Sequence, residues 1–97
     1  MSKHFFVKLV PPRTTFAQDI SAGEQEIMQR HGAFWTDLVH KRIAVVCGPV
    51  LDPAGIYGIG VAEAEDEAAL HAVLENDPGK ELLSYEIHPT RAVHRGQ

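Results

Sequence analysis

Cysteine is almost absent from the sequence, in which Cys47 is the one thiol among 97 residues. A single cysteine excludes an internal disulfide and is typical of proteins kept in a reducing compartment. No apolar run approaches the roughly 20 residues that cross a membrane. The first six residues also lack the layout of a signal peptide. We therefore expect a cytoplasmic protein without a membrane segment.

Runs of like charge are absent too. Nine basic and 13 acidic residues give a net charge of -4, which argues against a nucleic-acid surface. The six histidines show no HxH or HxxxH spacing, and no CxxC occurs, so a prebuilt metal site is not predicted. An adventitious ion near His31 stays open. Because no glycine loop of the phosphate-binding type occurs, we expect no cofactor.

The remaining composition is that of one globular domain spanning 1–97, with 44% apolar and 23% charged residues. Its core is expected over about 4–90, and the segment from Pro89 onward has no pattern and is predicted to be a mobile tail. Alternation, turn signals and caps predict four strands and two helices. The strands are expected at 4–10, 43–50, 56–64 and 82–87, and the helices at 21–41 and from Asp66 to about 76.

The first predicted helix begins with a Ser-x-x-Glu capping box, formed by Ser21 and Glu24. Its apolar stripe contains Ile27, Phe34, Trp35 and Leu38, with His31 among them. A buried imidazole needs a polar partner, and its ordinary pKa near 6.5 suits general acid–base chemistry. The alternative is a structural histidine that bonds only a backbone carbonyl in a dry core.

The predicted order β-α-β-β-α-β indicates an α+β, ferredoxin-like fold, a four-stranded antiparallel sheet with two helices on one face. The open face is predicted to carry mainly apolar residues, which favours a homodimer that buries sheet against sheet. These residues are Phe6, Val10, Ala44, Val46, Ile56 and Ala62. Gly58 and Gly60 leave little side-chain volume on their face of the strand, which indicates close approach of another group.

Several motifs in order resemble the YciI-like (YCII-related) family. They are a Pro-Pro-Arg-x-Thr-Phe-Ala segment at 11–17, the Met28-x-x-His31-x-x-x-Trp35 pattern, a strand ending in Gly48-Pro49 with Asp-Pro-x-Gly at 52–55, and a helix ending in Asp77-Pro78. The resemblance covers about residues 4–90. It implies a dimeric α+β barrel of ferredoxin-like protomers with a His31–Asp77 pair. One relative is a dehydrochlorinase of a chlorinated hydroxyhydroquinone, which implies a small aromatic or cyclic substrate.

The sequence departs from that family at three places. Many relatives have arginine where this chain has Met28, and many have glycine where it has Arg42. The segment between Asp77-Pro78 and the last strand is also short. The first departure puts a substrate-anchoring arginine in doubt, although Arg13 or Arg30 could substitute.

Other residues are candidates for substrate binding. Arg13 and Phe16 lie in a long loop, where an arginine could hold a carboxylate or phenolate, or could equally be a solvated arginine. Gly48 and Pro49 would shape the backbone beside the pocket, and Trp35 would be mostly core. Asp52 is a second carboxylate, although Asp-Pro-x-Gly also describes a turn. Cys47 is expected to be buried as a small hydrophobe.

Three functions remain open from the sequence. The first is a cofactor-independent enzyme of isomerase or lyase type, in which His31 moves a proton and Asp77 orients its ring. The second is a non-catalytic homodimeric module that binds a small ligand or serves as an accessory subunit. The third is a cofactor-free oxygenase of the dimeric α+β barrel type.

Overall fold

The computed structural model describes residues 3–93 and residue 95. Its elements run β1 (Lys3–Val10), α1 (Phe16–Asp19), α2 (Ala22–His40), β2 (Ala44–Val50), β3 (Tyr57–Ala64), α3 (Glu67–Leu74), the 3₁₀ turn η1 (Pro78–Glu81) and β4 (Ser84–Thr90). In the described residues no helix is both long and apolar enough to cross a membrane.

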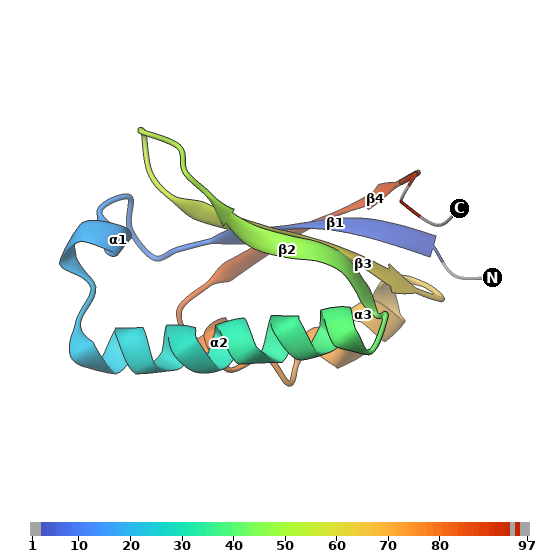
Figure 1. The fold of residues 1–97 in the computed structure, drawn as a ribbon, viewed down its shortest axis with the longest axis horizontal. Coiled ribbons are helices and arrows are strands. Elements are labelled where there is room, and N and C mark those ends of the chain that lie inside the picture. Colours follow the sequence, from blue (N-terminus) through green and yellow to red (C-terminus); the bar gives the residue numbers. More distant parts are fainter. Residues whose placement is uncertain (1–2, 94, 96–97) are drawn as a thin grey trace.

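The four strands form one antiparallel sheet in the order β2-β3-β1-β4. Helices α2 and α3 cover one face of this sheet, and no helix of the described residues lies on the opposite face (Figure 1). The predicted α+β, ferredoxin-like arrangement is therefore confirmed. Strand β1 is one of the two central strands. Its side chains Phe5, Val7 and Leu9 face the helices and are at most 3% exposed.

Three local predictions differ from the structure. The long loop predicted around Arg13 and Phe16 contains the short helix α1, and the segment after Asp77 forms η1. The last strand begins at Ser84 and continues through Thr90, so Pro89 belongs to β4 and not to a tail. Proline is tolerated there because β4 is an edge strand. The remaining predicted tail includes residues 94 and 96–97, which lie outside the described part of the chain.

The prediction of the open sheet face was partly wrong. Ala44 and Ala62 lie on the helix side, with 3% and 0% exposure. Ala62 stands opposite Phe5, so the two side chains share a face, and an irregularity between Ala44 and Val46 breaks the alternation in β2. Ile56 precedes β3 altogether. A strand register cannot be obtained from alternation in one strand, which is why these assignments failed.

Other apolar residues do lie on the open face. Val61 stands opposite Phe6 on one side and Val46 on the other. Directly opposite residues project to the same side of a sheet, so these three side chains form one row. Val46 is 50% exposed. The described residues therefore leave this apolar row partly exposed.

Helix α2 is fixed at both ends by local hydrogen bonds. Ser21 Oγ accepts from the Glu24 amide, and Glu24 Oε1 accepts from the Ser21 amide, which completes the predicted capping box. At the other end Arg42 donates to the Val39 carbonyl and the next residue donates to the Leu38 carbonyl, as in a Schellman motif. Both ends are thus defined, and His31 lies midway along the helix.

Candidate active site

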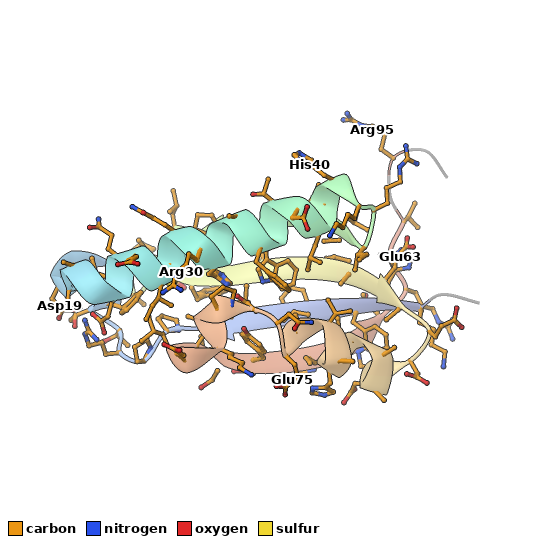
Figure 2. All side chains as sticks on the ribbon, turned by 90° about the horizontal axis from the view of Figure 1, so that it is seen from below. Asp19, Arg30, His40, Glu63, Glu75 and Arg95 are labelled. Atoms are coloured by element: carbon orange, nitrogen blue, oxygen red, sulfur yellow. The ribbon has the colours of Figure 1, made fainter. Side chains whose placement is uncertain are left out.

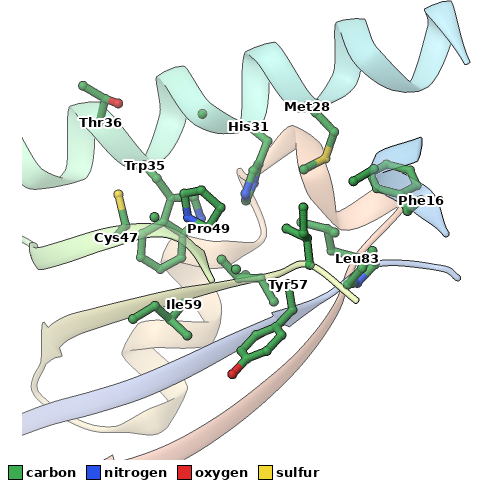
Figure 3. Close-up of a pocket in the computed structure, with 17 residues that line it drawn as sticks. Phe16, Met28, His31, Trp35, Thr36, Cys47, Pro49, Tyr57, Ile59 and Leu83 are labelled. Carbon is green, nitrogen blue, oxygen red and sulfur yellow. The ribbon is translucent and has the colours of Figure 1, made fainter. Parts of the chain in front are cut away.

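A pocket of about 410 Å³ lies between α2, the α1 segment and strands β2 and β3. Its lining includes the apolar residues Leu9, Phe16, Met28, Trp35, Pro49 and Leu83. His31 also lines the pocket, and its ring projects from α2 toward the strands (Figure 3). A concave apolar site with a few polar side chains is typical of small-molecule binding.

The structure brings His31 and Asp77 together. His31 Nδ1 lies 2.9 Å from both Oδ1 and Oδ2 of Asp77. The Asp77 side chain is 0% exposed and that of His31 is 12% exposed, so the pair is shielded from water. The alternative of a histidine that bonds only a backbone carbonyl does not match this geometry.

Asp77 is held by the start of η1, where it is the N-terminal cap. Its Oδ1 accepts from the Gly79 amide at 2.8 Å. Its Oδ2 accepts from Trp35 Nε1–H at 3.0 Å and from the Tyr85 hydroxyl at 2.6 Å. Side chains from α2 and β4 therefore converge on one carboxylate, which explains how this aspartate can be buried.

The surrounding donors keep Asp77 ionised. Burial alone raises the pKa of Asp77, but hydrogen bonds from His31, Tyr85 and the Gly79 amide outweigh burial and hold that pKa below its ordinary value. The Tyr85 pKa is raised, first by burial and then by its bond to the carboxylate. An ionised carboxylate can only accept hydrogen bonds.

The charge state of Asp77 determines the tautomer that we assign to His31. Because the carboxylate only accepts, Nδ1 of His31 must carry the proton of their contact. In a neutral imidazole this leaves Nε2 with a lone pair. Among the described residues, the His31 ring has no hydrogen-bond partner besides Asp77. The arrangement can thus present a base to the pocket.

Two glycines permit the close packing of this site. A Cβ on Gly79 would lie 2.5 Å from His31 Nδ1, and a Cβ on Gly60 would lie 2.4 Å from Trp35 Cζ3. Neither position can hold a side chain without displacing the ring beside it. The group predicted to approach Gly60 is therefore Trp35. The approach of His31 to Gly79 was not anticipated.

The structure places four of the predicted binding residues at the pocket and two outside it. Phe16, Trp35, Gly48 and Pro49 line it. Asp52 does not, and its Oδ1 accepts from the Ala54 amide within the turn. The roles of these residues in substrate binding remain predictions.

Arg13, the sixth predicted binding residue, also lies outside this pocket and is bound to two carboxylates. It donates two hydrogen bonds to the Glu24 carboxylate, at 2.8 and 2.9 Å, one to the Asp19 carboxylate at 2.7 Å and one to the Asp19 carbonyl at 3.3 Å. The hydrogen bonds that Glu24 accepts from Arg13 and from the Ser21 amide lower the pKa of Glu24 to about 2. The guanidinium lies 5.1 Å from the Phe16 ring centroid. Arg13 thus secures the α1 segment to the start of α2, at the end of the molecule where Figure 2 labels Asp19.

Two functional features were missed in the sequence. Tyr85 alternates with Leu83 and Ile87 in the predicted last strand, so its side chain was expected on one face together with them. A buried tyrosine hydroxyl needs a partner, and that requirement could have indicated Tyr85. Trp35 was treated mostly as core, although its indole N–H needs an acceptor in the same way. Both donate to Asp77.

Metal and thiol chemistry receive no support from the described residues. No group of three or more His, Cys, Asp or Glu side chains in the described part of the chain could hold a metal ion. Cys47 lines the pocket as well, and burial raises the pKa of its thiol. A raised pKa keeps the thiol protonated and poorly nucleophilic.

Comparison with known proteins identifies a structural neighbour but no family. No family model matches the chain, and no curated protein matches it. A solved structure of 5-chloro-2-hydroxyhydroquinone dehydrochlorinase (TftG) from Burkholderia phenoliruptrix, in complex with 2,5-dihydroxybenzoquinone, is similar to it. The TM-score is 0.62 and the identity 22%, over 93% of this chain and 94% of the other. At this identity, the likeness shows a shared fold.

Proposed function

We propose that the protein is a cofactor-independent enzyme that transfers a proton on a small cyclic or aromatic substrate, in an isomerase or lyase type of reaction. His31 is the general acid–base, and Asp77 orients its ring and fixes its tautomer. The observation that carries this proposal is the contact of both Asp77 oxygens with His31 Nδ1 at the wall of an apolar pocket.

The proton moves between the substrate and Nε2 of His31. Neutral His31 with hydrogen on Nδ1 accepts a substrate proton at Nε2, and the resulting imidazolium lies against an ionised carboxylate. The ion pair stabilises that charge where water is largely excluded. The same ring can return the proton at a second position of the substrate or to a leaving group. No redox step and no metal are needed for such a transfer.

Two further observations support the choice of substrate class. The pocket is lined by Phe16 and Trp35, whose rings suit a planar ligand. The structural neighbour of the same fold is a dehydrochlorinase crystallised with a six-membered quinone ring. The ordered motifs, from Pro11 to Pro78, also support membership of the YciI-like family, which we include in the proposal.

Proton transfer is testable without knowing the natural substrate. We would incubate cyclic ketones, lactones and hydroquinones with the protein in D₂O and follow deuterium incorporation by NMR. Wild type is expected to accelerate exchange on at least one compound, and His31→Asn to abolish the acceleration. His71→Asn is a matched control, because His71 is exposed and pairs with Glu67 on the surface of α3. Equal exchange by wild type and His31→Asn would contradict the proposal.

A non-catalytic ligand-binding module is the second candidate, and the apolar character of the pocket favours it. It predicts that ligands raise the melting temperature of wild type and of His31→Asn alike. No compound would exchange its protons in this case. Thermal shift and deuterium exchange on one compound library therefore separate the two functions.

We further propose that a second copy of the chain covers the open sheet face. The row of Phe6, Val61 and Val46 supports this, since exposed apolar rows on sheets favour association. Light scattering should show a dimer for wild type and a monomer for Val46→Asp. Leu51→Asp is the control, because Leu51 is 77% exposed in the β2–β3 connection. A monomeric wild type at micromolar concentration would refute the dimer.

A further inference from the structure

Among the described residues, those that line the pocket carry no Asp, Glu, Lys or Arg side chain. Among its 17 lining residues none is Asp, Glu, Lys or Arg, and His31 is the one histidine. The other polar residues in the lining are Thr36, Cys47 and Tyr57. Tyr57 points its hydroxyl away from α2, to the far side of the strand (Figure 3). A ligand in this pocket therefore meets a mainly apolar wall, two small uncharged polar side chains and one imidazole.

Arg13 and Arg30 do not supply a positive charge to the pocket. Arg13 is bound by the carboxylates of Glu24 and Asp19, and it does not line this pocket. Arg30 precedes His31 on α2 but is exposed and does not line the pocket either. Neither side chain is placed to receive a negative group of a bound ligand.

A negative charge lies directly behind His31, which lines the pocket. Asp77 is buried, ionised and in contact with His31. An anionic ligand beside His31 would be repelled by this carboxylate when the ring is neutral, and it would lose its hydration without gaining a cation. A ring without charge avoids both costs.

We propose that the pocket selects uncharged planar rings over their anionic counterparts, and that Met28 sets this selection. Met28 lies three residues before His31 on α2, so both side chains project from one face of the helix. Both residues line the pocket. A cationic side chain at position 28 would therefore lie at the pocket, where it could bind an anionic ligand. This inference rests on the proposed function, because it assumes that the pocket beside His31 binds the substrate. It concerns ligand affinity alone, so its test requires no turnover.

The test compares ligands that differ only in charge. The pairs are methyl 4-hydroxybenzoate with 4-hydroxybenzoate and methyl benzoate with benzoate, titrated calorimetrically at neutral pH. Wild type is expected to bind each ester at least about tenfold more tightly than its carboxylate. Met28→Arg should reverse or remove that preference, whereas Met28→Gln, which is polar but uncharged, should keep it. Circular dichroism confirms that each variant is folded, and Met28→Lys replaces Met28→Arg if the latter is not.

Several results would overturn the selection. Wild type could bind the carboxylates as tightly as the esters, or it could bind no ester at millimolar concentration. A folded Met28→Arg and a folded Met28→Lys could both retain the wild-type preference. Failure of the proposed function gives a different pattern, in which esters are preferred by wild type and by His31→Asn while no compound exchanges protons.

Discussion

Replacement of Asp77 by asparagine removes the charge on which the site depends. The carboxylate accepts from His31, Trp35, Tyr85 and the Gly79 amide. Asparagine offers one acceptor oxygen and an amide that donates, so the amide faces groups that also donate. The tyrosine hydroxyl can rotate to accept, but the indole N–H of Trp35 cannot.

The cost follows from the bonds that are lost. A hydrogen bond to a charged group contributes about 1.5–3 kcal/mol, and a buried donor without an acceptor costs about 1–3 kcal/mol. The smaller desolvation of a neutral amide offsets part of this loss. We expect Asp77→Asn to lower the free energy of unfolding by about 3 kcal/mol, which for a domain of this size is about 12–24 °C in melting temperature.

Calorimetry at neutral pH measures this loss against a matched control. Asp52→Asn makes the same chemical change at the other Asp-Pro pair, where the side chain is exposed and accepts from the Ala54 amide. Asparagine can accept there equally well, so a change below about 0.5 kcal/mol is expected. An Asp77→Asn protein that melts within a few degrees of wild type would refute the account of a buried, ionised acceptor.

Three further predictions concern stability. Because the folded pKa of Asp77 is below the ordinary 3.8, its contribution is full above that value and is lost on further acidification. The gap in melting temperature between wild type and Asp77→Asn should therefore narrow below pH 3.8, and a constant gap would contradict this. Arg42 has φ of 64° at the end of α2. Arg42→Gly should stabilise by about 0.5–1 kcal/mol in urea unfolding, since relief of left-handed strain exceeds the added chain entropy. Arg42→Ala should not stabilise. Gly60→Ala should cost about 1–3 kcal/mol because its methyl group overlaps the Trp35 ring, and a Gly23→Ala control, with nothing within 4 Å, should not.

The fold could be predicted because local signals determine it. The Ser21–Glu24 capping box and the alternating β1 side chains depend on neighbours in sequence, and both match the structure. The face assignments of Ala44 and Ala62 failed because register depends on residues of another strand and on an irregularity in β2. Local periodicity carries no information on either.

The site was predictable only in part, for a similar reason. His31 stands out because an imidazole on an apolar stripe needs a partner, but no rule of spacing selects Asp77, 46 residues away. That partner was implied by family resemblance. Tyr85 and Trp35 were missed as donors because their bonds exist only after α2, η1 and β4 have packed together. Arg13 is the opposite case. Its position in a loop indicated substrate binding, but its partners Asp19 and Glu24 are close in sequence and give it a local structural contact.

The decisive measurement is the tautomer of His31, because proton transfer at the pocket requires an unprotonated Nε2. Long-range ¹H–¹⁵N correlation spectra, recorded where the ring is neutral and assigned with His31→Asn, distinguish a proton on Nδ1 from one on Nε2. The account predicts a protonated Nδ1 and a free Nε2 facing the pocket. A proton on Nε2 would contradict the assignment of His31 as the base. Nδ1 would then donate no hydrogen bond to Asp77, and Nε2 could not accept a proton from a ligand in the pocket.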